Sequence, residues 1–292
     1  MPAGSASTRS SGCWPRSPER CSSLGLVTEP TLQSDLRLAR ELADMADAIS
    51  MDRFRSVDLV VTTKPDMTPV SDADRAVERA LRAGIADSRP GDSVRGEEFG
   101  TSGESHRQWI IDPIDGTKNF VRGVPVWATL IALAIDGVPV AGVVSAPALG
   151  KRWWAATGQG AFINERLGSE TTNEARRIRV SQVSELSDAS ISLSGLTRWE
   201  GAGRLAQMLE LSRGVWRTRD YGDMWPYMMV AEGLLEASAE YDLQVYDMAA
   251  LVPIVQEAGG AFTSVEGEPG PWHGSALATN GLLHDRIVAA LA

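Results

Sequence analysis

The stretch WIIDPIDGTKNF, residues 109–120, places two aspartates, Asp112 and Asp115, three positions apart inside an apolar run. A carboxylate in such surroundings is costly unless a partner compensates its charge. Pro113 cannot donate a backbone hydrogen bond, so we expect the strand WIID to stop there and a tight turn to follow. Such a turn would aim both carboxylates at one point, with the carbonyl group of Ile114 between them.

The second half of this stretch predicts an anion-binding turn. Gly116 permits an unusual φ or the close approach of a ligand. Residues 117–120 then begin a helical turn whose free N–H groups suit a phosphate. Beside the two aspartates, this is what a Mg²⁺-dependent phosphoryl enzyme requires. The alternative is an ordinary Asp-Pro turn with an Asx cap and a loop glycine.

Other charged residues stand where predicted strands end or predicted helices begin. Each one alone has an ordinary explanation as a solvated turn residue, a helix cap or a strand-end charge. Their conjunction indicates a site that the fold assembles from distant segments. These residues are Lys64, Asp74, Glu97, Glu98, Glu240 and Asp247.

The bulk composition limits the class of protein. The chain has 292 residues, 43% of them hydrophobic, and a formal net charge of -10. This suits one large globular domain or two closely joined ones, and argues against nucleic acid as a partner. The longest apolar run, residues 126–135, is too short for a membrane span and fits a buried strand. From Leu24 onward there is no cysteine, which fits a reducing cytoplasm.

The first segment differs in composition from the rest of the chain. Residues 1–25 are rich in Ser, Pro, Gly and Arg and lack the apolar stretch of a secretory signal. We therefore expect residues 1–30 to be a disordered extension. A transit-like segment, or a translation start at Val27, are the alternatives.

The remaining residues, 31–292, predict a layered α/β fold with subregions of about 31–177 and 178–292. Helices are expected over 34–54, capped by Ser34 or Asp35, and over 71–88, capped by Ser71 or Asp72. Strands are expected over 93–99, 108–113, 126–135, 140–147 and 152–156, and residues 164–177 are expected to be a loop. Beyond about residue 178, strands (178–181, 189–194, 215–220, 235–240, 261–265, 276–280) alternate with helices (204–212, 223–235, 246–260, 282–291).

Together these residues resemble the inositol monophosphatase family of Mg²⁺-dependent, lithium-sensitive phosphatases, over roughly residues 33–292. The family signature is present as GEE (96–98), WIIDPIDGTKNF (109–120) and YDMAALVPIVQEAGG (246–260). The Asp-Pro stretch matches every fixed position of the family pattern, whereas Tyr246 stands where the family usually has Trp. The resemblance implies a single catalytic domain over 31–292, folded as an alternating αβαβα sandwich.

The resemblance also implies a metal ligand set. Glu97, Asp112 and the Ile114 carbonyl would hold one Mg²⁺. Asp112, Asp115 and Asp247 would hold a second, and Glu97 would share a third, more weakly bound ion. The aspartates would therefore be paired with two or three Mg²⁺ ions rather than with each other.

The implied catalytic residues are Asp74, Thr117 and Glu97, of which Asp74 and Thr117 would orient the water that attacks phosphorus. The backbone amides of Gly116, Thr117 and Lys118 would bind the phosphate oxygens. Two or more metal ions can stabilise charge on both the entering and the leaving oxygen without a covalent intermediate.

Within the family, residues 118–133, 136–162 and 219–233 look most like the actinobacterial histidinol-phosphatase branch. This implies hydrolysis of L-histidinol phosphate to L-histidinol and phosphate in histidine biosynthesis. Asp223 would place a carboxylate near the leaving group, and Glu240 would contact its hydroxyl or amine; both suit a cationic substrate. The alternative for Asp223 is an N-cap of the following helix.

Several alternatives stay open from the sequence. An inositol-1-phosphatase or a broad sugar-phosphate phosphatase would use the same ligands, and a catalytically silent Mg²⁺ or phosphate-binding module would keep them. The family commonly forms homodimers, for which the Trp153–Trp154 pair, expected to be exposed, is a candidate interface. Four tryptophans either wall the imidazole of the substrate or pack in the core: Trp127, Trp153, Trp154 and Trp225.

Overall fold

A large mixed sheet is built around the strand that carries the Asp-Pro stretch, β5 (Arg107–Asp115). In the computed structural model, which describes residues 31–65, 67–165 and 174–292, β5 pairs antiparallel with β6 (Ala128–Ile135) and parallel with β3 (Ser93–Gly96). The strand order is β10-β9-β8-β7-β6-β5-β3-β4. The other strands of this sheet are β4 (Gly100–Ser102), β7 (Val138–Ala146), β8 (Lys151–Ala156), β9 (Gly160–Glu165) and β10 (Arg176–Arg177). The expectations for residues 1–30 and for most of the loop at 164–177 lie outside the described residues.

Two long helices, α1 (Leu32–Arg53) and α2 (Asp72–Ser88), cover one face of this sheet. Their apolar residues pack with Trp109, Ile111 and other side chains of the central strands. The cap of α2 is Ser71, as expected. The cap of α1 is Thr31, so the expectation of Ser34 or Asp35 is wrong; Thr31 accepts a hydrogen bond from the N–H of Ser34. A small hairpin, β1 (Val61–Thr63) and β2 (Pro69–Ser71), connects the two helices.

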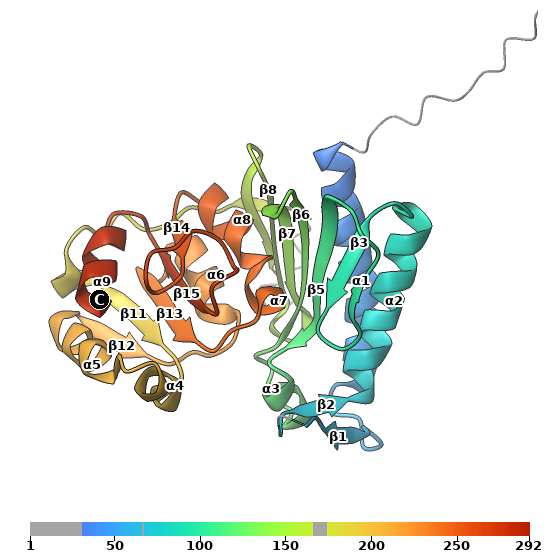
Figure 1. Cartoon of the computed structure of the whole chain (residues 1–292), viewed down its shortest axis with the longest axis horizontal. Helices are drawn as coiled ribbons and strands as arrows, with labels where there is room; N and C mark the ends of the chain where they lie inside the picture. The colour runs from blue at the N-terminus through green and yellow to red at the C-terminus, as the bar shows by residue number, and fades with distance from the viewer. Residues whose placement is uncertain (1–30, 66, 166–173) are drawn as a thin grey trace, which may run out of the picture. The chain divides into compact units, whose positions relative to one another are not determined.

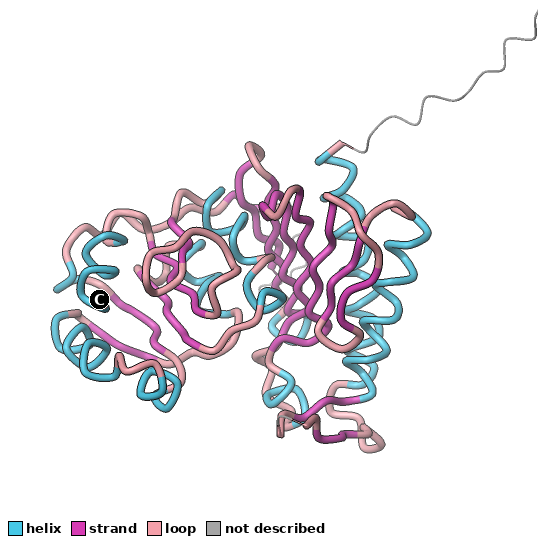
Figure 2. Tube along the Cα trace, in the orientation of Figure 1, coloured by secondary structure: helices cyan, strands magenta, loops and turns pink. Residues whose placement is uncertain are grey.

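A second sheet lies beyond a middle layer of helices, and Figures 1 and 2 show the resulting five layers. This sheet has the order β12-β11-β13-β15-β14. The αβαβα sandwich expected from the sequence is confirmed. The middle layer contains α6 (Trp225–Ala231), α7 (Val245–Met248) and α8 (Leu251–Glu257). The strands of the second sheet are β11 (Ser190–Leu193), β12 (Arg217–Arg219), β13 (Ala237–Tyr241), β14 (Ala261–Thr263) and β15 (Ser275–Thr279). The outer helices are α4 (Leu196–Gly201), α5 (Leu205–Gly214) and α9 (His284–Leu291).

Besides α3 (Thr117–Val121), which follows β5, the described residues contain two short connecting elements. These are the 3₁₀ helices η1 (Pro147–Leu149) and η2 (Leu186–Asp188). The expected strand at 178–181 is wrong, because the strand in this region is β10, which ends at Arg177. The backbone N–H groups of Ile178 and Val180 donate to the carbonyls of Ala161 and Ala258, which belong to different elements, so no continuous ladder forms.

The strand β5 does not stop at Pro113, contrary to the expectation, but continues to Asp115. The register on β6 shifts, with Asp112 opposite Leu130 and Asp115 opposite Ala128. The extra residue on β5 forms a bulge, where a missing proline N–H costs no ladder hydrogen bond. The strand thereby delivers both aspartates to the same end of the sheet.

The single helix expected over residues 246–260 is divided into α7 and α8. Pro253 has no N–H to donate to the residue four positions earlier, so a continuous helix would lose a hydrogen bond there. The carbonyl oxygen of Ala250 instead approaches Gly142 in β7, where a Cβ would lie only 2.2 Å from it. The break anchors α7, and with it Asp247, against the large sheet.

The Trp153–Trp154 pair is buried, so the expectation that it is exposed is wrong. Trp153 is 0% and Trp154 6% exposed. The indole N–H of Trp153 donates to Glu232, and the ring of Trp154 stacks on Phe162. Trp127 is also fully buried, against Phe54. These three tryptophans therefore pack in the core, the alternative to walling the imidazole of the substrate.

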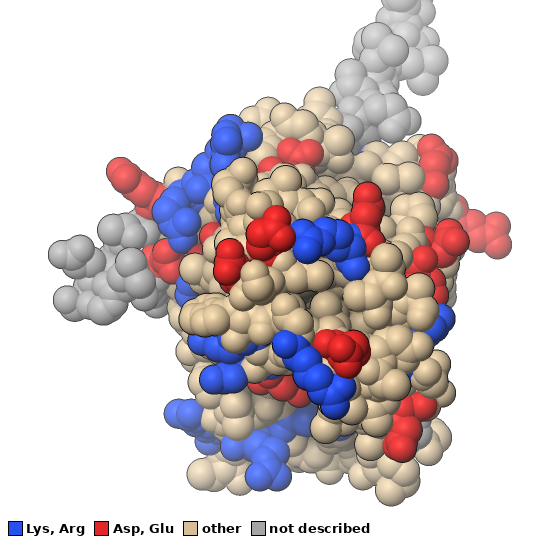
Figure 3. Space-filling model, turned by 90° about the vertical axis from the view of Figure 1, so that its left-hand side faces the viewer, with Lys and Arg blue, Asp and Glu red and all other residues tan. Residues whose placement is uncertain are grey.

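Acidic and basic side chains are interspersed on the end of the molecule shown in Figure 3. Surface charges of both signs in close alternation hold neighbouring segments together weakly, since exposed pairs contribute at most about 1 kcal/mol each. Within the described residues, no helix combines the length and apolar character needed to cross a membrane.

Candidate metal and phosphate site

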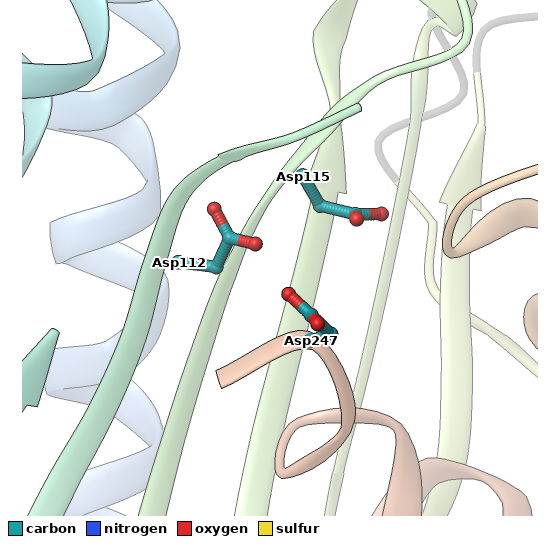
Figure 4. Close-up of side chains that lie close together, drawn as sticks. All are labelled: Asp112, Asp115 and Asp247. Atoms are coloured by element: carbon teal, nitrogen blue, oxygen red, sulfur yellow. The ribbon is translucent and has the colours of Figure 1, made fainter. Parts of the chain in front are cut away.

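Three aspartates from two distant segments meet at the end of β5 (Figure 4). Asp112 and Asp115 come from the bulge, and Asp247 comes from the third position of α7. One carboxylate oxygen of each lies within 4.8 Å of those of the other two. A local bulge and the break before α8 therefore create a cluster of hard oxygen donors.

Each aspartate is oriented by a backbone amide. Asp112 accepts a hydrogen bond from the N–H of Ile114 at 3.0 Å, and Asp115 from the N–H of Met224 at 2.7 Å. Asp247 accepts from the N–H of Gln244 at 2.7 Å in a capping box. These bonds leave other carboxylate oxygens free to bind a cation.

The three carboxylates repel one another strongly. Burial and the neighbouring acids raise the pKa of Asp112 and of Asp115 well above the usual range. Burial also raises the pKa of Asp247 to about 6. A cation among them would remove this repulsion, and an all-oxygen set of this kind fits Mg²⁺ or Ca²⁺ rather than a softer metal. The donor set is therefore compatible with the metal implied by the sequence.

A fourth carboxylate, Glu97, lies in the turn between β3 and β4. The ammonium group of Lys64 lies between Glu97 and Glu98, at 2.7 and 2.6 Å from their carboxylate oxygens. Burial raises the pKa of Glu97 to about 7 despite this cation, and the charge of Asp247 contributes to the rise. Glu97 thus belongs electrostatically to the aspartate cluster.

Thr117 and Asp74 form a hydroxyl–carboxylate pair next to the cluster. The hydroxyl of Thr117 lies 3.1 Å from Asp74 Oδ1 and 3.1 Å from the carbonyl oxygen of Ile114. Asp74 sits in the capping box of α2, and burial raises its pKa. Between the pair and the cluster, Gly116 adopts a φ of +85°, and a Cβ there would lie 3.0 Å from the Val126 carbonyl oxygen. The residues from Thr117 to Val121 form α3, the expected helical turn.

A pocket of about 260 Å³ adjoins these groups. Eight residues expected from the sequence line this pocket, whereas the buried residues Asp74, Asp112 and Ile114 are not among its lining. The eight residues are Glu97, Asp115, Gly116, Thr117, Lys118, Asp223, Glu240 and Asp247. Of the four tryptophans that could have walled the substrate, none is among the described residues of this lining.

Two more carboxylates, Asp223 and Glu240, line the same pocket, and that of Asp223 lies next to Gly116. Asp223 Oδ2 accepts a hydrogen bond from Asn119 at 2.6 Å, and burial raises the pKa of Asp223 to about 6. Met224, not Asp223, stands at the N-cap of α6, so the capping alternative for Asp223 is wrong. Burial raises the pKa of Glu240 to about 7.

Arg198 is a pocket residue that the sequence reasoning missed. Its guanidinium donates to Glu240 Oε1 at 2.7 Å and lies 3.6 Å from Asp242. Arg198 comes from α4, a helix of six residues that begins after Gly195 in a left-handed conformation. The only local signal was this glycine before a short amphipathic stretch, and no periodicity over so few residues would identify a helix.

We expect Mg²⁺ to stabilise this protein more at pH 8 than at pH 5. The pKa of Asp247 is about 6 and that of Glu97 about 7 in the folded, metal-free protein, above the ~4 of an unfolded chain. In the metal-free protein, the contribution of these two carboxyl groups to the free energy of unfolding therefore falls as pH rises from about 4 to 7. Over the same range they lose the protons that compete with Mg²⁺ for their oxygens. Thermal unfolding with Mg²⁺ and with EDTA at both pH values measures the difference. An equal Mg²⁺-induced shift at pH 5 and pH 8 would show that these carboxylates do not bind the ion.

Known proteins are similar to this chain in both sequence and fold. A family model described as the inositol monophosphatase family matches residues 31–292. A protein of Streptomyces coelicolor named histidinol-phosphatase is 59% identical over 266 residues, which cover 90% of this chain and 98% of that protein. A Mycobacterium tuberculosis protein of the same name is 55% identical, over 88% of this chain and 97% of that protein. The crystal structure of the extragenic suppressor protein suhB of Bartonella henselae matches with a TM-score of 0.79 at 30% identity, over 88% of this chain and 98% of that one.

Proposed function

This chain belongs to the inositol monophosphatase family, and from that premise we propose that it hydrolyses L-histidinol phosphate to L-histidinol and phosphate with the help of Mg²⁺. Two relatives named histidinol-phosphatase are more than half identical to it over nearly their whole length. The observation that carries the proposal is the meeting of the aspartate cluster, the Thr117–Asp74 pair and two further carboxylates around one pocket.

The ligands of the metal would be the carboxylates of Glu97, Asp112, Asp115 and Asp247 and the carbonyl oxygen of Ile114. We propose two or three Mg²⁺ ions for this set. When bound, Mg²⁺ supplies Lewis-acid stabilisation of the phosphoryl charge and makes a water molecule a stronger nucleophile. The ammonium group of Lys64 pairs with Glu97, one of these ligands, and a bound metal ion would take its place there.

The Thr117–Asp74 pair would position the attacking water. The Thr117 hydroxyl donates a hydrogen bond to Asp74 Oδ1 at 3.1 Å. Thr117 Oγ1 can therefore accept a hydrogen bond from the water. Burial raises the pKa of Asp74, which makes it a better base than an exposed aspartate. The proton lost by the water would thus move toward Asp74.

The phosphate would lie over the start of α3. The backbone N–H groups of Gly116, Thr117 and Lys118 precede the first hydrogen bonds of that helix, in which Asn119 and Phe120 donate to the Gly116 carbonyl. The exposed ammonium of Lys118 lines the same pocket and adds positive charge. The left-handed φ of Gly116 keeps this cradle open, because a side chain there would be strained and crowded.

The leaving group would lie between Asp223 and Glu240. Both carboxylates line the pocket, and Arg198 neutralises Glu240 in part. Asp223 has an amide donor, Asn119, as its hydrogen-bond partner rather than a cation. A positively charged amino-alcohol fits this side of the pocket better than a neutral cyclitol.

We expect Asp223→Asn to raise KM for L-histidinol phosphate about tenfold, ~1.4 kcal/mol, with a smaller effect on kcat. Asparagine tolerates the positive φ of +49° at this position, so the change removes charge with little strain. Steady-state kinetics on L-histidinol phosphate and on inositol 1-phosphate measure the effect. KM for inositol 1-phosphate, whose leaving group carries no charge, is the control and should stay unchanged; an unchanged KM for histidinol phosphate would remove Asp223 from substrate recognition.

We further propose that the protein works as a homodimer in the cytoplasm. The family resemblance supports the dimer, and the lack of cysteine beyond residue 24 supports a reducing compartment. Light scattering of the purified protein and fractionation of cells test the two statements. A monomeric mass would reject the first, and recovery outside the cytoplasm would reject the second.

A further inference from the structure

Glu78 is a fully buried carboxylate in the middle of α2 that the mechanism above does not use. Its exposed fraction is 0%. Glu78 Oε2 accepts a hydrogen bond from the N–H of Glu98 at 2.7 Å, and Oε1 accepts one from the N–H of Phe99 at 3.2 Å. A buried carboxylate is costly to maintain, and here its hydrogen bonds go to the turn that follows Glu97.

The turn is shaped to receive this carboxylate. Gly96 is the last residue of β3, and a Cβ on it would lie 2.1 Å from Glu78 Oε1. A side chain at position 96 would displace the Glu78 carboxylate, so glycine is required by that carboxylate rather than by an unusual φ. Glu97 follows directly, and its position is therefore set by the contact between Gly96 and Glu78.

Arg82, one turn further along α2, completes the attachment. Its guanidinium lies 2.8 Å from Glu78 Oε1, donates to Ser102 Oγ at 2.9 Å and also donates to the carbonyl of Gly100. These bonds hold β4, the strand that follows the turn, to the helix. The pair Glu78–Arg82 is thus a clamp between α2 and the turn that carries Glu97.

Asp74, on the same face of α2, holds Thr117. Residues four positions apart on a helix lie one above the other, about 6 Å apart along the axis. On the basis of the proposed function, we propose that Glu78 is a positioning residue that fixes Glu97 relative to the Thr117–Asp74 pair. α2 would then set the spacing between a metal ligand and the group that orients water.

Glu78→Gln tests this role. One amide oxygen cannot replace two carboxylate oxygens, so a backbone N–H of the turn loses its acceptor and the pairing with Arg82 weakens. We expect the dissociation constant for Mg²⁺, measured by calorimetry on the metal-free protein, to rise about 10- to 100-fold, as for other residues that orient metal ligands. Activity should recover toward the wild-type value as Mg²⁺ is raised. A merely structural loss would lower the melting temperature without this dependence on Mg²⁺.

The control is Ile85→Ala, also on α2 but in the core against α1. It should lower the melting temperature in EDTA while leaving Mg²⁺ affinity within twofold of wild type. If Glu78→Gln does not fold, Glu78→Asp decides, since it keeps the charge but withdraws the carboxylate by one methylene. Wild-type affinity for Mg²⁺ in either folded variant would overturn the positioning role alone, whereas a wild-type protein that binds no Mg²⁺ would overturn the proposed function with it.

Discussion

Asp112→Asn is expected to lower kcat at least about a thousandfold, ~4 kcal/mol of transition-state stabilisation. Burial raises the pKa of Asp112 most, and the charges of Glu97, Asp115 and Asp247 raise it further. Asp112 is also the buried member of the aspartate cluster: it is 2% exposed, whereas Asp115 and Asp247 are half-buried. An amide at this position cannot offer the negative oxygen that a hard cation prefers.

The same change should not unfold the protein. Asparagine keeps an oxygen that can accept the hydrogen bond from the Ile114 N–H, so the bulge in β5 can persist. Without metal, removal of one charge relieves repulsion, and the melting temperature in EDTA at pH 8 should stay equal or rise. Loss of activity together with unchanged or higher metal-free stability is thus the expected signature.

Phosphate release and thermal unfolding of the variant check both parts. Asp87→Asn, at an exposed position of α2, is the control and should behave like wild type. An Asp112→Asn enzyme that retains activity within tenfold of wild type would mean that the aspartate cluster does not bind the catalytic metal.

Thr117→Ala is expected to lower kcat about a hundredfold while Mg²⁺ affinity changes less than threefold. The hydroxyl is held by Asp74 and by the Ile114 carbonyl, so it is oriented before substrate arrives. Alanine removes the hydroxyl but leaves the carboxylates of the cluster in place. The loss should therefore fall on the attacking water rather than on the metal.

Thr117→Ser is the matched variant, because it keeps the hydroxyl and loses only a methyl group. It should retain activity within about tenfold of wild type. Steady-state kinetics at saturating Mg²⁺ and calorimetry with Mg²⁺ measure the two quantities. Equal activity of the alanine and serine variants would show that the hydroxyl takes no part in the reaction.

The local chemistry of the site was predictable from the sequence where neighbouring residues determine it. Asp112, Asp115 and Thr117 belong to one stretch whose proline and glycine restrict the backbone, and the structure brings Asp112 and Asp115 together. Asp247 was found because an acid before an apolar helix is a recognisable pattern, although it proved to be the third residue of α7 rather than its cap. The succession of apolar strands and amphipathic helices predicted a layered α/β fold, and the family resemblance implied its αβαβα order.

Features that depend on tertiary contacts were not predictable. The bulge in β5 needs the register with β6, and the break between α7 and α8 needs the approach of Ala250 to Gly142. Glu240, the partner of Arg198, is 42 residues away in sequence, and Glu98, whose N–H donates to Glu78, is 20 residues from it. Spacing in one sequence carries no signal for such pairs, because any of many charged residues could have met them.

The measurement that tests the central claim most directly is phosphate release with Mg²⁺ from L-histidinol phosphate and from inositol 1-phosphate, side by side. We expect kcat/KM to be about a hundredfold higher for L-histidinol phosphate, ~2.7 kcal/mol of discrimination, and both activities to vanish in EDTA. Equal values, or a preference for inositol 1-phosphate, would contradict the proposed substrate and favour an inositol or broad sugar-phosphate phosphatase built on the same metal ligands.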